Sequence, residues 1–169
     1  VYSTLAGFGG YQQIALMGAA QSVMQFAFVP IWGMSQGMQP AVGTNFGAKE
    51  YGRVKKLTMM FIGGASILAT FFFILIQLFP KQILSAFIKD AEIVENGVGD
   101  FRLMFVIFFS YGLLIMTVTY FQSLGKGLQA IILVILRQIA LVVPLVKLLP
   151  LILGTTGVWL AIPLNDGIV

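Results

Sequence analysis

The sequence predicts an all-α fold, a polytopic bundle of transmembrane helices, and three observations support this. Hydrophobic residues make up 59% of the 169 residues and charged residues only 9%, against about 45–50% and about 25% in ordinary globular domains. The mean hydropathy is +0.96. With 10 basic and 6 acidic side chains, too few charges are present to cover a water-facing surface. This composition excludes disordered, disulfide-rich secreted and nucleic-acid-binding proteins.

Histidine and cysteine are both absent. Their absence excludes zinc sites built on these residues, thiol catalysis and acid–base chemistry by histidine. No recognisable nucleophile or carboxylate pair lies within the apolar segments, so we expect no enzyme, no catalytic residue, no metal site and no cofactor.

The first predicted span covers residues 14–44, a stretch without charge. As a helix it would be about 46 Å long at 1.5 Å per residue, whereas a bilayer core is about 30 Å thick. It must therefore tilt, kink or protrude, and Pro30 and Pro40 supply kinks. Residues 1–10 read as the tail of an earlier element that ends at Gly9-Gly10.

Four further apolar segments follow in order. Residues 57–79 end at Pro80, residues 103–121 are uncharged, and residues 128–151 are interrupted by Arg137 and Lys147. Residues 154–169 begin a span that the chain does not finish. We therefore expect a piece of a longer membrane protein, a partial lobe over residues 1–169.

The connecting segments predict the orientation in the membrane. Lys49, Arg53, Lys55 and Lys56 crowd the loop 49–56, opposed only by Glu50. Short loops rich in Lys and Arg remain in the cytoplasm. The loop 49–56 is thus predicted to be cytoplasmic and the loop 81–100 extracellular, in a multi-pass protein of the inner (plasma) membrane.

Four glutamines on the first span carry the strongest functional signal. At 100° per residue, Gln21, Gln25, Gln36 and Gln39 fall within about 60° of one another, with Trp32 and Ser35 on or near the same stripe. Unpaired amides facing lipid would cost a few kcal/mol each. This face meets either other helices, as interhelical hydrogen bonding, or a water-accessible cavity, and the sequence favours neither. The candidate cavity or substrate residues are Gln36, Gln39, Gln25, Met38, Trp32 and Asn45.

Two charges lie at membrane depth in the last predicted spans. Arg137 is about nine residues into its span and Asp166 about twelve residues into the next. Ionisable groups at this depth are functional candidates by default. For Arg137 a structural or gating role is favoured over substrate contact, with snorkelling to the membrane edge as the competing account. Asp166 is either an ion site or a structural charge.

Several stretches, in order, resemble the MATE (multidrug and toxic compound extrusion) transporters, in particular their bacterial multidrug branch. They are the run from Gly33 to Lys49, Phe79-Pro80-Lys81, the run from Phe121 to Lys126, Leu136-Arg137-Gln138 with Pro144 and Pro150, and the run from Gly157 to Pro163 with Asp166. The resemblance implies half of a two-lobe, twelve-helix transporter whose N-terminal six-helix lobe is missing here.

The resemblance also implies a function. Such proteins export bulky, often cationic amphipathic xenobiotics by alternating access, in exchange for H⁺ or Na⁺. Sodium-coupled members resemble one another in carrying acids that residues 103–121 lack, so we expect H⁺ in preference to Na⁺. The alternatives are a lipid-linked sugar flippase on a related scaffold, which would need more deep basic residues than Arg137, and a non-transporting structural membrane subunit. The expected partners are small xenobiotic molecules and the lipid bilayer, with no nucleic acid.

Overall fold

The computed structural model describes residues 2–128 and 132, with side chains from residue 12 onward. Within this part the chain is helical and contains no strand. Its elements are α1 (Tyr2–Gly47), α2 (Tyr51–Leu78), α3 (Pro80–Ser85), α4 (Ala91–Met104), the short 3₁₀ helix η1 (Phe108–Ser110) and α5 (Tyr111–Ser123). The predicted all-α fold is confirmed. The expected spans 128–151 and 154–169 lie outside the described residues, apart from the first positions of the former.

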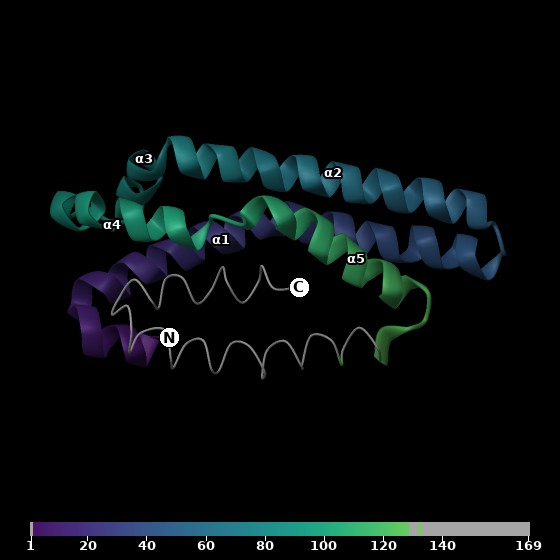
Figure 1. The fold of residues 1–169 in the computed structure, drawn as a ribbon, viewed down its shortest axis with the longest axis horizontal. Coiled ribbons are helices and arrows are strands. Elements are labelled where there is room, and N and C mark those ends of the chain that lie inside the picture. Colours follow the sequence, from purple (N-terminus) through teal and green to yellow (C-terminus); the bar gives the residue numbers. More distant parts are fainter. Residues whose placement is uncertain (1, 129–131, 133–169) are drawn as a thin grey trace.

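Three long helical segments have the length and apolar character to cross a membrane: Gln12–Gly47, Tyr51–Leu78 and Ala91–Ser123. α1 and α2 run side by side in opposite directions, and α5 lies against both (Figure 1). α3 and α4 lie at the end of α2 that is remote from the α1–α2 turn (Figure 1). The described part is thus a small bundle whose two ends differ in structure.

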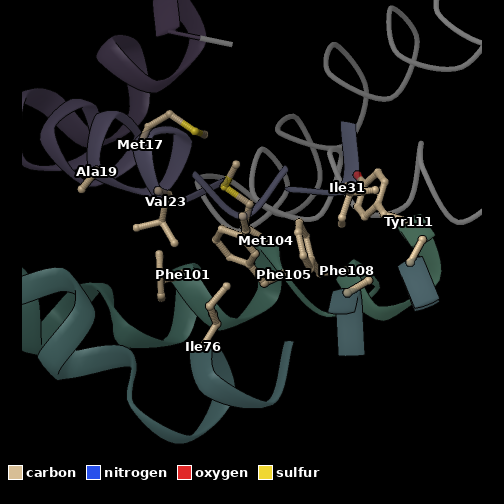
Figure 2. Close-up of a cluster of buried hydrophobic side chains, with 14 of the residues drawn as sticks. Met17, Ala19, Val23, Ile31, Ile76, Phe101, Met104, Phe105, Phe108 and Tyr111 are labelled. Atoms are coloured by element: carbon tan, nitrogen blue, oxygen red, sulfur yellow. The ribbon is translucent and has the colours of Figure 1, made fainter. Parts of the chain in front are cut away.

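The core lies where α1, α2, α4 and α5 meet. Phe101, Phe105 and Phe108 are completely buried, as are Ile31 and Met17, and Figure 2 shows these side chains gathered in one cluster. In lipid, burial of apolar surface from water does not hold helices together, so contacts of this kind stabilise the bundle through close packing.

The helix α1 is longer than the sequence predicted. Residues 2–10, expected to end an earlier element, are the first turns of α1 instead. Gly9 and Gly10 cost a helix about 1 kcal/mol each, which is too little to end it. The chain turns sharply in its purple N-terminal part (Figure 1). Pro30 and Pro40 lie inside the helix without interrupting it.

The basic cluster lies on a helix rather than in a loop. Only residues 48–50 connect α1 to α2, and Arg53, Lys55 and Lys56 occupy the first turns of α2 with exposed side chains. The first turn of α2 carries no acid, and Glu50 at its N-cap makes no side-chain cap. Basic charge at a helix N-terminus opposes the helix dipole, so the cluster is not there to stabilise α2.

The predicted loop 81–100 is wrong: it contains α3 and most of α4. The Asp90 side chain caps α4 by accepting hydrogen bonds from the backbone N–H groups of Glu92 and Ile93, at 3.0 and 3.4 Å. Glu92 in the first turn and Arg102 in the last turn both suit the helix dipole. The charges that suggested a loop are the polar face and caps of an amphipathic helix.

The predicted span 103–121 is interrupted near its start. α4 ends at Met104, and the chain passes through a tight turn and η1 before α5 begins. In the turn, Phe105 N–H and Phe108 N–H donate to carbonyls three residues back, at 3.2 and 3.0 Å. The break lets Phe105 and Phe108 both enter the core, with their ring centroids 5.6 Å apart. Tertiary packing of aromatic rings thus overrides the helical register.

Candidate functional site

The glutamine stripe of α1 has an exposed part, which we call the exposed α1 face: Gln25, Trp32 and Gln36. Both glutamines are exposed, and Trp32 keeps 57% of its surface accessible. All three lie on one side of the helix, because their positions fall within about 40° at 100° per residue. Three of the predicted candidates therefore share one accessible face.

Trp32 is held in place from behind by aromatic residues. Its indole stacks on Phe28, with centroids 6.0 Å apart and planes 21° apart. Phe28 in turn packs edge-on against Tyr111, with ring centroids 5.0 Å apart, and at a tilt against Phe108, with centroids 5.3 Å apart. The exposed indole is therefore anchored to the core at the point where α4 and α5 are separated, and it offers a flat aromatic surface for stacking or cation–π contact.

Pro40 adds backbone polarity to the exposed α1 face. Proline has no N–H, so the carbonyl of Gln36 loses the hydrogen bond that residue i+4 would donate. Gln36 thus presents a side-chain amide and a backbone carbonyl in the same turn. Acceptors and donors concentrated on an apolar helix are typical of a ligand-contacting surface in a membrane protein.

The remaining polar residues of the stripe bond to α5. Ser35 and Thr119 are buried, and their hydroxyl oxygens lie 2.7 Å apart. The Thr119 hydroxyl donates its single proton to Ile115 O at 2.7 Å, so Ser35 donates and Thr119 accepts. One turn further, Gln39 Nε2 donates to Gln122 Oε1 at 3.3 Å. The stripe therefore bonds between helices at Ser35 and Gln39, whereas a cavity at its exposed part stays a prediction.

The other candidates lie apart from the exposed α1 face. Met38 is completely buried in the core. The Asn45 amide donates to the carbonyl of Ala41 at 2.8 Å, within its own helix. Gln21 is partly buried and has a polar or electrostatic partner. Arg137 and Asp166 lie outside the described residues.

The exposed α1 face is uncharged. Neither α1 nor α5 contains an acidic or basic residue, and no group of His, Cys, Asp or Glu in the described residues could hold a metal ion. Such a surface offers dispersion, aromatic stacking and amide hydrogen bonds, contacts that suit large amphipathic molecules better than compact ions.

Sequence reasoning missed Phe28, Tyr111, Thr119 and Gln122. Thr119 and Gln122 are three residues apart and therefore share a helix face. This polar pair at the end of an apolar segment was the signal that could have indicated an interhelical contact. The aromatic support of Trp32 required knowledge of the break before α5, which no periodicity predicts.

A bundle of membrane-length helices, with an uncharged polar and aromatic face on a proline-containing helix, defines the chain as part of a helical integral membrane protein. The MatE family model matches residues 2–147. The chain therefore belongs to the MatE family.

Individual relatives agree with this assignment. The chain is 26% identical over 154 residues to the multidrug export protein MepA of Staphylococcus aureus, covering 91% of this chain and 34% of MepA. It is 20% identical over 156 residues to the FAD transporter of Shewanella oneidensis, covering 92% of this chain and 34% of that protein. It thus spans about a third of the length of these relatives.

A solved structure is also similar. The structure of the MATE multidrug transporter DinF-BH in complex with a ligand matches with a TM-score of 0.84 and 39% identity, covering 97% of this chain and 37% of that one. The predicted family resemblance is confirmed.

Proposed function

We propose that this chain forms part of the C-terminal lobe of a multidrug exporter. The carrying observation is the MatE match over residues 2–147, supported by 39% identity to a MATE multidrug transporter solved with a ligand. The chain pairs with an N-terminal six-helix lobe of the same protein, and the substrate cavity lies between the lobes. Transport, rather than catalysis, is its activity, and the inner (plasma) membrane is its location.

The proposed substrates are bulky, cationic amphipathic compounds. The exposed α1 face supports this through the indole of Trp32, which offers stacking and cation–π attraction, and through the amides of Gln25 and Gln36. Its lack of charge leaves recognition to shape and polarizability. Such a surface tolerates chemically diverse ligands.

We further propose that protons, rather than sodium ions, drive export. In the described residues no acid lies on α1 or α5, so neither helix itself supplies a carboxylate to a sodium ion. The coupling carboxylate then belongs to the other lobe. Inverted repeats that rock around a central site can couple an ion in one lobe to a substrate in the gap between the lobes.

The test uses the full-length protein that contains this chain, in cells that lack their own exporters, with the aromatic cationic dye ethidium as the substrate. We expect energised cells to extrude ethidium in sodium-free buffer and to stop when the proton gradient is collapsed. Strict dependence on sodium would overturn proton coupling while leaving export intact. Export of FAD without export of ethidium would overturn the proposed substrate class.

A further inference from the structure

A groove on the outer side of the bundle lies apart from the exposed α1 face. It is about 450 Å³ in volume and lies between the C-terminal half of α2 and the C-terminal half of α4. This volume falls within the range of about 300–1,000 Å³ typical of ligand sites. Its apolar walls are formed by Phe73, Ile74, Leu78, Leu103 and Val106.

Among the described residues that line the groove, Arg102 is the one that carries a charge. Arg102 Nη2 donates to Gln77 O at 3.0 Å, and Gln77 Nε2 donates back to Arg102 O at 3.1 Å. These reciprocal bonds fix the guanidinium beside the last turn of α2. Within the described residues the salt bridge that forms joins Lys81 to Glu95, so Arg102 keeps its charge and further N–H donors for another anion.

The groove lies at a depth that fits a phospholipid. Gln77 and Leu78 are the last residues of the membrane-length helix α2, which places the guanidinium at the level of the lipid headgroups. Exposed Phe79 and Phe87 lie at the same end of the bundle, as aromatic residues do at membrane interfaces. From Leu78 to Ile74 the groove runs one helical turn toward the bilayer interior, so the charged end is outermost and the apolar end is deepest.

The surface around the groove is apolar and exposed. Only 17% of the most apolar stretch of α2 is buried, compared with 39% in α1. Ile67, Phe71 and Ile74 are exposed along its outer side. The groove is continuous with this apolar surface. Lipid that covers the surface therefore has free access to the groove.

We propose that this groove binds one anionic phospholipid, with the headgroup phosphate on Arg102 and an acyl chain along the apolar walls. The lipid belongs to the leaflet remote from the basic cluster of α2. By filling the space between α2 and α4, it holds α4 and the following helix break against the bundle. The proposal requires only that the chain spans a membrane and does not depend on drug export.

The test is native mass spectrometry of the full-length protein titrated with dioleoylphosphatidylglycerol or with dioleoylphosphatidylcholine, which has the same chains and no net charge. We expect preferential retention of the anionic lipid by the wild type. Arg102→Gln should weaken this binding about tenfold, as expected for the loss of a hydrogen bond to a charged group. Arg102→Lys should restore it in part.

One further variant tests the acyl-chain contact, and another controls for surface charge. Val106→Trp fills the groove and should reduce binding of both lipids. Lys89→Gln changes the net charge equally at the same end of the bundle, outside the groove, and should bind like the wild type.

Equal losses in Lys89→Gln and Arg102→Gln would overturn the proposal, because general surface charge would then explain binding. Unchanged binding in Val106→Trp would overturn it as well. If inorganic phosphate at equal concentration displaced the lipid, the proposed contact between the acyl chain and the apolar walls would be overturned. The groove would then be a site for anions in general. Ethidium export, measured on the same variants, reports separately on the proposed function.

Discussion

At the scale of single residues, the position of a glutamine on the stripe determines whether its side chain is exposed or bonded to another helix. Gln36 is exposed, whereas Gln39 bonds to Gln122. Chemically identical side chains three residues apart therefore differ in their surroundings, and we expect one to serve ligand contact and the other helix association.

This difference gives a prediction for Gln36→Leu and Gln39→Leu. Gln36→Leu should lower ethidium export about two- to tenfold, the loss expected for one amide hydrogen bond of about 0.5–1.5 kcal/mol, at unchanged thermal stability. Gln39→Leu should instead lower stability by about 0.6 kcal/mol, the average for an interhelical bond in a membrane. Export and melting temperature, measured on both variants, check this. Normal export in Gln36→Leu would remove that residue from the substrate site.

Gly112 marks a close approach of two helices. A Cβ built on Gly112 would lie 2.5 Å from the carbonyl carbon of Ala65 and 2.6 Å from the backbone N of Ser66. These neighbouring atoms belong to the backbone of α2, so they cannot move aside by a side-chain rotation. The glycine is therefore needed for α5 to contact α2 directly, as small residues commonly allow in membrane bundles.

We expect Gly112→Ala to destabilise the protein by about 1–3 kcal/mol or more, as overpacking does. Gly63→Ala is the matched control, because a Cβ at Gly63 meets nothing within 4 Å and alanine favours a helix by about 1 kcal/mol. Yield and melting temperature in detergent compare the two variants. Equal stability of both would contradict the direct contact of α2 and α5.

At the scale of elements, α4 depends on its cap more than on its surface ion pair. Asp90 bonds to two backbone N–H groups at the helix start. The Lys81–Glu95 pair has side chains that are 57% and 72% exposed, and exposed pairs contribute little. The Glu95 carboxylate is thus a minor contributor to the placement of α4.

Asp90→Ala should destabilise α4 by about 1 kcal/mol, the usual cost of losing an N-cap, and Asp90→Asn should retain the cap. Hydrogen exchange of the Glu92 and Ile93 amides provides the measurement, with faster exchange expected in Asp90→Ala alone. Glu95→Ala is the control and should exchange like the wild type. The opposite ranking would make the ion pair the main anchor of α4.

The sequence predicted the helical class and the shared face of Gln25, Trp32 and Gln36, because composition and the 100° periodicity carry this information. It did not predict α4, because charges at Asp90, Glu92 and Asp100 resemble a loop until the caps are recognised. The break near Phe105 also escaped prediction. It arises from contacts between residues far apart in sequence, such as Phe28 with Phe108.

At the scale of the whole molecule, the two ends of the bundle differ in what they offer. One end carries the short α1–α2 turn and the other carries α3 and α4 (Figure 1). The exposed basic cluster lies at the first end and the groove at Arg102 at the second. The exposed α1 face lies between them. The regions proposed for drug contact, lipid contact and orientation are thus separate, so variants in one region leave the others measurable.

The connection through residues 48–50 also bears on how the chain enters the membrane during synthesis. A link this short makes α1 and α2 leave the ribosome as one helical hairpin with its tip at Lys49 and Arg53. Pulling that tip across the bilayer would cost about 2.5–3.5 kcal/mol for each basic side chain on the translocon scale. We therefore expect the hairpin to insert with its tip held back and its open end delivered across the bilayer, before any later helix has been made.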